Sequence, residues 1–333
     1  MSHTPTVRRP PLAGVTWHKP LLILAALMAV TGLVSVVGLV ADPREIVGMP
    51  AWAKPLKFSI SILLYALTLS WLIGQVRSAP RLAWWSGVVA VAALVAEMII
   101  IVGAVLAGTT SHFNVTSPLH QAMWGIMAIS IVVVWLASLV IGILLFRVRG
   151  ADPARSSAIR AGVVIGLVGM ALGFLMTSPT AAQLDDWQGI SGAHTVGAGD
   201  GGAGLFLLGW STEAGDLRVP HFVGMHALQL LPIAAILLEA ATRRVAVLRE
   251  PLVRRRILRV LAVLYTGILG VLTLQALAGQ SVIHPSAGIM LGSTALVLLA
   301  ALAIAVIMMR GRSLDRSAAS FGPAARPVAG GAS

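Results

Sequence analysis

The sequence predicts an all-α protein whose eight helices cross a lipid bilayer. Hydrophobic residues make up 57% of the 333 residues and charged residues only 11%, against roughly 25% charged residues in soluble domains. Apolar runs near the ~20 residues that cross ~30 Å of hydrocarbon recur along the whole chain. We expect the spans at residues 21–40, 56–76, 84–107, 119–146, 161–178, 220–241, 257–279 and 287–309.

These spans divide the chain into one membrane domain, residues 21–310, and two tails. Residues 1–20 form an N-terminal cytoplasmic tail, and residues 311–333, rich in Ala, Gly, Pro and Ser, predict a disordered cytoplasmic tail. The first apolar run is longer than the about 7–15 residues of a signal-peptide core, so we expect the first helix to be retained. No internal repeat stands out, although a four-plus-four arrangement would suit the number of spans.

The basic residues predict the orientation. Of the 24 Lys and Arg residues, all but Arg44, Lys54, Lys57 and Arg218 fall in segments that lie inside if both termini are cytoplasmic. This bias follows the positive-inside rule. It also explains the net charge of +12 without nucleic acid, because the basic residues form neither an amphipathic face nor an RNA-reading motif. The excess of Arg over Lys suggests a bacterial protein, hence the plasma membrane.

Two features of the chain indicate where function lies. The connection at residues 177–219 is long for a loop between spans, which is typical of a functional loop or a lid. The span that follows contains Pro232, which predicts a kink one to two turns below His226. Neighbouring groups can also satisfy the carbonyl that such a proline frees, in which case the proline has no functional meaning.

Polar residues gather in the outer halves of the spans. Six of the eight histidines map to the outer side: His112, His120, His194, His221, His226 and His284. Glu97 lies about 15 Å beneath the outer end of its span. A charge at that depth costs several kcal/mol unless it faces a partner or water. We therefore predict a polar cavity that opens outward between the second, third, sixth and seventh spans.

The histidines are candidate metal ligands. His221 and His226 are five residues apart, about 140° around a helix, so they do not form the i, i+4 pair of a zinc protease. With His112 and His194 they would make a site of three or four imidazoles suited to zinc, copper or iron. The alternative is that these histidines bind loop carbonyls at the membrane surface. Haem is less favoured, because only His226 lies well inside a span, and the absence of cysteine excludes thiolate sites.

Two functions follow from these residues. In the first, a membrane enzyme or redox protein uses Glu97 and His226 for catalysis and a metal held by the four histidines. In the second, a transporter or receptor binds a small polar or anionic solute. Glu97 then accepts a proton or pairs with Lys57 as a structural ion pair. The solute-binding residues expected for this second function are Lys57, Asn114, Arg218 and Gln229.

Four strings also resemble a known group of proteins. They are KPLKF at 54–58, SHFN at 111–114, GAHTVG at 192–197 and GDLRVPHFVGMHALQ at 215–229. Together they resemble an uncharacterised family of multi-pass bacterial membrane proteins with no assigned activity. The resemblance covers the second to sixth spans, about half of the chain. It implies a shared fold and a common site for these strings at the outer face, and it implies no activity, cofactor or substrate.

Overall fold

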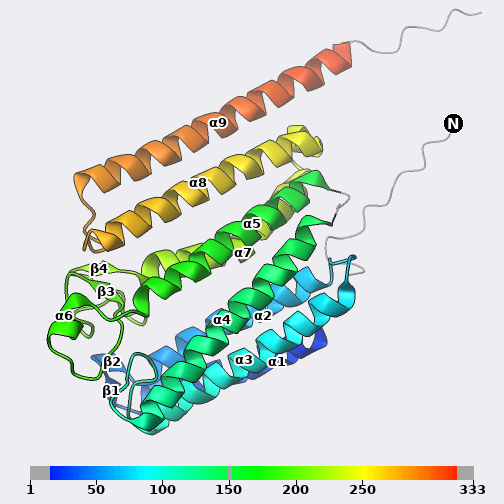
Figure 1. Cartoon of the computed structure of the whole chain (residues 1–333). Coiled ribbons are helices and arrows are strands. Elements are labelled where there is room, and N and C mark those ends of the chain that lie inside the picture. Colours follow the sequence, from blue (N-terminus) through cyan, green and yellow to red (C-terminus); the bar gives the residue numbers. More distant parts are fainter. Residues whose placement is uncertain (1–15, 149–151, 321–333) are drawn as a thin grey trace, which may run out of the picture.

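The computed structural model describes residues 16–148 and 152–320. Within these residues, eight helices are long and apolar enough to cross a membrane, and they run side by side (Figure 1). The chain is therefore an all-α multi-pass membrane protein, as the sequence predicts. The helices are α1 (Lys19–Ala41), α2 (Ala53–Ile73), α3 (Pro80–Leu106), α4 (Pro118–Phe146), α5 (Pro153–Leu172), α7 (Arg218–Ala241), α8 (Pro251–Leu277) and α9 (Ala287–Ser320).

The short elements gather at one end of the bundle, on the left in Figure 1. We call it the long-loop end, and the opposite end, which carries most of the arginines, the basic end. At the long-loop end, two antiparallel pairs of strands precede α2 and α7. The short elements are β1 (Glu45–Ile46), β2 (Met49–Pro50), β3 (Thr195–Val196), β4 (Gly215–Asp216), the 3-10 turn η1 (Gly173–Met176) that continues α5, α6 (Ala181–Asp185) and, at the basic end, η2 (Ala246–Arg249).

Two predicted boundaries differ from the structure. The fifth span was expected at 161–178, but α5 begins at Pro153 because its two arginines have partners at the basic end. Arg155 forms an ion pair with Glu239 on α7, and Arg160 donates to the carbonyl oxygens of Phe146 and Val148. At the C-terminus, α9 continues to Ser320, into the tail predicted to be disordered. The remainder of that tail, 321–333, and residues 1–15 lie outside the described residues.

The structure shows an internal repeat that the sequence analysis missed. The first half contains α1 to α4, and the second contains α5, α7, α8 and α9. In each half a long helix, a pair of short strands and three further long helices follow one another, and the second half also contains η1, α6 and η2. The second helix of each half has a fully buried proline as its third residue, Pro55 in α2 and Pro220 in α7. The third helices, α3 and α8, each have 27 residues and each begin with a proline.

The third helices also end in the same way. Both close on Leu-Ala-Gly, at 106–108 and 277–279, and the two glycines have left-handed φ angles of 68° and 71°. The Gly108 N–H donates to the oxygen of Val105 at 3.1 Å, and the Gly279 N–H donates to the oxygen of Ala276 at 3.0 Å. The next N–H reaches back five residues in both helices. This is the Schellman pattern, in which a glycine ends the helix without a Cβ clash.

The buried positions of α3 and α8 also correspond. With Pro80 placed on Pro251, an offset of 171 residues, six of the seven buried residues of α8 fall on buried residues of α3. Because each half contains an even number of spans, the second half starts from the same side of the membrane as the first. The halves are therefore parallel repeats, a plan that recurs among membrane transporters.

The first two helices of each half form a close pair. A Cβ on Gly169 of α5 would lie 2.1 Å from the carbonyl carbon of Gly224 on α7, so the two backbones are in direct contact and only glycine fits there. The equivalent pair, α1 and α2, packs Gly32 against Ser59. The halves meet where α4 packs on α5 and where α2 touches α7. Leu69 and Leu72 of α2 line one small cavity together with Leu228 of α7.

Candidate functional site

Charged side chains from four segments interact at the long-loop end. Lys54 on α2 interacts electrostatically with Glu97 on α3 and with the side chains of His112 and His194 in the two connecting loops. We call the whole set the long-loop cluster. Its members are Lys54, Lys57, Glu97, His112, His194, Asp200, Asp216 and Arg218.

Glu97 is the deepest member of the cluster. It lies nine residues, about 13 Å, from the end of α3, and it is only 3% exposed. Among the described residues its carboxylate has no hydrogen-bond partner, and the charge that acts on it is the ammonium of Lys54. The expected structural pair with Lys57 is wrong, because Lys57 is engaged elsewhere. An acidic group held this way inside a membrane span is a functional candidate by default.

Lys54 complements Glu97 without forming a close ion pair. It is partly buried in the first turn of α2, and in the part of the chain described it donates no hydrogen bond. The charges within its electrostatic range are Lys57, Glu97, Arg218 and Asp200. An ammonium group that is shielded from water and lacks a fixed acceptor is suited to bind a small anion.

His112 lies in an aromatic box beside Lys54. The centroid of its ring is 5.7 Å from that of Phe58 and 5.6 Å from that of Trp124, and Ser111 Oγ is 3.0 Å from its Nδ1. Burial, together with the positive charges of Lys54 and His194, lowers the pKa of His112 well below its usual value. The imidazole is therefore neutral at pH 7.

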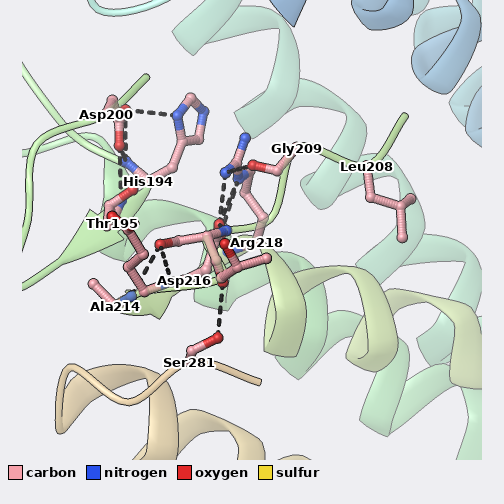
Figure 2. Close-up of polar contacts among 12 residues, drawn as sticks. His194, Thr195, Asp200, Leu208, Gly209, Ala214, Asp216, Arg218 and Ser281 are labelled. Atoms are coloured by element: carbon pink, nitrogen blue, oxygen red, sulfur yellow. Dashed lines mark hydrogen bonds and ion pairs between the residues drawn. The ribbon is translucent and has the colours of Figure 1, made fainter. Parts of the chain in front are cut away.

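His194 lies on the long loop and is oriented by Asp200, as Figure 2 shows. The Nδ1 atom donates to Asp200 Oδ2 at 2.8 Å, which leaves the lone pair on Nε2. The ring packs on Phe113, with 4.8 Å between centroids. Burial lowers the pKa of His194, and the bond to Asp200 only partly offsets this. Burial alone would raise the pKa of Asp200, but the hydrogen bonds from His194 and Thr195 hold it far below its usual range.

Two cations hold the tip of the long loop, residues 205–210. Lys57 Nζ donates to the oxygen of Leu208 at 2.8 Å, and Arg218 donates to the oxygen of Gly209. Arg218 is itself fixed by Asp216, with Nε 2.9 Å from Oδ1 and Nη2 2.6 Å from Oδ2 (Figure 2). Asp216 is 2% exposed and also accepts from the N–H of Ser211 at 2.8 Å. The two predicted solute ligands Lys57 and Arg218 therefore bind backbone carbonyls of the long loop.

Other predicted site residues have structural partners. Asn114 accepts from the N–H of Thr116 at 3.0 Å and so closes a turn. His221 Nδ1 is 2.9 Å from the oxygen of Gly169, which places its ring at the contact of α7 with α5. The ring of His226 packs on Phe222, with 4.4 Å between centroids.

Gln229 forms a side-chain hydrogen bond with His226, but its Oε1 is buried without a partner among the described residues. α7 continues through Pro232 as one helix.

The predicted metal site and the predicted polar cavity can be compared with this geometry. No three His, Asp or Glu side chains in residues 16–148 and 152–320 are arranged to hold one metal ion, so the four predicted ligands His112, His194, His221 and His226 do not form one centre there. An apolar cavity of about 10 Å³ lies between α2, α4, α5 and α7, lined by residues such as Leu69, Ser138 and Leu228. The polar groups of the long-loop cluster lie at the long-loop end instead, where Lys57 and Arg218 bind the loop tip.

Sequence reasoning missed three members of the cluster, Lys54, Asp200 and Asp216, the last of which was noted only as part of the string at 215–229. Lys54 was considered only for its charge, since nothing in the sequence fixes how α2 is rotated toward α3. Asp200 lies in a Gly-Asp-Gly-Gly string that reads as an ordinary turn. The one available signal was its position six residues after His194, within reach of an imidazole in a tight loop.

Comparison with known proteins adds no further assignment. No protein-family model, no curated protein and no solved structure matches this chain. The resemblance at residues 54–58, 111–114, 192–197 and 215–229 therefore stays a prediction, and the function has to be inferred from the long-loop cluster itself.

Proposed function

We propose that this protein is a transporter of a small anionic solute and that the solute moves together with a proton carried by Glu97. The observation that carries the proposal is Glu97 itself, which is 3% exposed within a membrane span and has no hydrogen-bond partner among the described residues. A carboxylate in such a place takes up a proton or pairs with a cation. Lys54 is the cation within range.

The chemistry of the pair suggests how proton and solute are coupled. While Glu97 is ionised, its charge attracts the Lys54 ammonium. A proton on Glu97 removes this attraction, and Lys54 is then able to bind an anion. One proton and one monovalent anion would thus enter together without net charge. The neutral imidazole of His112, next to Lys54, offers the anion a hydrogen-bond donor at no cost in charge.

The architecture supports transport more than catalysis. Parallel repeats are one of the recurring plans of membrane transporters, whose sites lie where the repeats meet. Here Lys54 and Glu97 come from the first half and Arg218 from the second, and Lys54 interacts electrostatically with both. Lys57 and Arg218, two cations of the cluster, are bound to the loop tip, so they would become free to bind the solute only when these two bonds open.

The basic residues support a location in the bacterial plasma membrane, with the long-loop end outside. Because the natural chain has no cysteine, single cysteines report the orientation directly. Gly202→Cys at the exposed long-loop end should react with a membrane-impermeant maleimide in intact cells, whereas Ala246→Cys at the basic end should react only after lysis. The reverse pattern would exclude this orientation.

Transport can be tested in proteoliposomes that contain a pH-sensitive dye. Phosphate, sulfate, lactate and succinate are added outside one at a time, and acidification of the interior is recorded. Wild-type protein should acidify the interior with at least one of these anions. Glu97→Gln should reduce the signal to that of empty liposomes, whereas the matched change Glu213→Gln at an exposed site should leave it unchanged. Equal fluxes for wild type and Glu97→Gln would refute the proposal.

One observation favours a membrane enzyme as the second candidate. The His194–Asp200 pair has the geometry of a general base with its orienting carboxylate, because Nε2 keeps its lone pair. A metal or haem need not take part in such chemistry. The liposome assay separates the candidates, since an enzyme without transport activity gives no anion-dependent acidification even in the wild type.

A further inference from the structure

The tip of the long loop, residues 205–210, has an apolar and exposed surface. Its sequence is Leu-Phe-Leu-Leu-Gly-Trp, and residues 201–212 contain no ionisable side chain. Phe206 is 87% exposed. Exposed apolar surface marks a site that binds protein or membrane. Which of the two covers the tip depends on where the tip lies relative to the membrane spans.

The contacts of the tip place it beside the first turns of α2 and α7. Lys57 Nζ donates to the oxygen of Leu208 at 2.8 Å, and the ring of Trp210 packs on Phe222 with 5.6 Å between centroids. Lys57 is the fifth residue of α2 and Phe222 the fifth of α7. Both helices begin at the long-loop end, so both residues lie about 6 Å along their spans from that end. The tip therefore lies at the level of the spans and not beyond them.

Both contacts also lie on the outward-facing sides of the two helices. On α2, Lys57 is followed one turn later by Ile60 and two turns later by Leu64, and both of these are exposed. On α7, Phe222 is itself exposed, and Ile233, three turns further along, continues the same exposed face. The apolar surface of the tip therefore continues into the surface that α2 and α7 present to lipid.

The backbone of the tip has the hydrogen bonds that such a position requires. Irregular backbone at membrane depth is tolerated only where protein satisfies its polar groups. Three N–H groups of the tip donate to carbonyl oxygens of the tip itself at 2.7–2.8 Å: Leu205 to Trp210, Leu208 to Phe206 and Gly209 to Leu205. Lys57 and Arg218 supply donors to two further carbonyl oxygens, those of Leu208 and Gly209 (Figure 2).

We propose that the loop tip is inserted into the bilayer leaflet at the long-loop end, with Phe206 among the lipid chains and Trp210 at the level of the headgroups. Trp210 has the side chain that is typical of this boundary. The partner is lipid, because the tip lies at the depth of the spans and carries no charge that a protein partner in water would read. The bilayer then supports the segment whose carbonyls bind Lys57 and Arg218. This inference does not depend on the transport activity.

Spin labelling tests the insertion, because the natural chain has no cysteine. The full chain with Phe206→Cys is labelled with a nitroxide and reconstituted at a low protein-to-lipid ratio, so that copies do not meet. Collisions of the label with oxygen, which concentrates in lipid, and with a water-soluble nickel chelate are then measured. The label at 206 should collide with oxygen far more than with nickel.

Two matched single-cysteine variants give the limits of the scale. Gly202→Cys lies in the same loop at an exposed position and should show the high nickel accessibility of water. Ile60→Cys lies on the exposed face of α2, deeper than Lys57, and should show high oxygen and low nickel accessibility.

The ratio of oxygen to nickel collisions at 206 should lie close to that at 60 and well above that at 202. A ratio at 206 equal to that at 202 would place the tip in water and overturn the proposal. Low accessibility to both reagents at 206 would also overturn it, because protein rather than lipid would then cover the tip.

Discussion

Glu97 and Lys54 interact electrostatically from neighbouring helices in the half of the membrane domain nearest the long-loop end, and neither has a hydrogen-bond partner among the described residues. The importance of Glu97 could be predicted from sequence, because a lone acid in an apolar run is costly wherever it points. That Lys54 acts on Glu97 could not be predicted from sequence. Both Lys54 and Lys57 lie in the first turns of α2, and only the packed structure shows that Lys57 binds a loop carbonyl while Lys54 acts on Glu97.

His112 makes the stability of the protein depend on pH. Its folded-state pKa is lowered well below the usual value by burial and by the charges of Lys54 and His194. As the pH falls below about 6.5, the unfolded chain takes up a proton that the folded chain does not, so folded-state stability decreases. Between pH 7.5 and pH 5.5 this single group should lower the free energy of unfolding by about 1.4 kcal/mol.

The measurement compares thermal unfolding of purified wild type and His112→Phe at the two pH values. Phenylalanine keeps the ring between Phe58 and Trp124 and removes the titrating group. The loss of stability at pH 5.5 should be smaller in the variant. An identical loss in both proteins would show that His112 does not carry this dependence.

At the scale of the elements, the spans were predictable and the loop only in part. Hydropathy gave all eight spans, because bilayer thickness sets helix length. The start of α5 was placed too late, since Arg155 and Arg160 look incompatible with a membrane helix until their partners at the basic end are known. The length of the connection at 177–219 indicated a functional loop, but which carbonyls it presents to Lys57 and Arg218 depends on its fold.

The bonds from Lys57 and Arg218 should control the opening of the loop tip. A hydrogen bond to a charged group contributes about 1.5–3 kcal/mol, so Lys57→Met should speed amide hydrogen exchange in residues 205–210 by about 10- to 100-fold. Mass spectrometry of exchanged peptides measures this. Lys19→Met, the same substitution at an exposed site at the basic end, should leave exchange at 205–210 unchanged. Equal exchange in Lys57→Met and wild type would mean that the bond to Leu208 does not restrain the tip.

At the scale of the whole molecule, the two halves share one plan, but the pair of Lys54 and Glu97 belongs to the first half alone. The equivalent of Lys54 in the second half is Val219, and the equivalent of Glu97 is Ile268. The two halves have little sequence identity, because a residue that faces lipid needs only to be apolar. Identical residues remain mainly at helix ends such as Leu-Ala-Gly. The repeat is recognised from helix lengths and buried faces, because packing constrains both. The long-loop cluster therefore takes four of its eight side chains from each half.

The central claim is that Glu97 changes its protonation when the solute binds, and infrared difference spectroscopy observes this most directly. The spectrum of the full-length protein is recorded with and without the anion that drives acidification in liposomes. Wild type should show the C=O stretching band of one protonated buried carboxyl group appearing on binding, and Glu97→Gln should lack that band while Glu213→Gln retains it. A band that persists in Glu97→Gln, or wild-type binding without any carboxyl band, would contradict the assignment of Glu97 as the proton carrier.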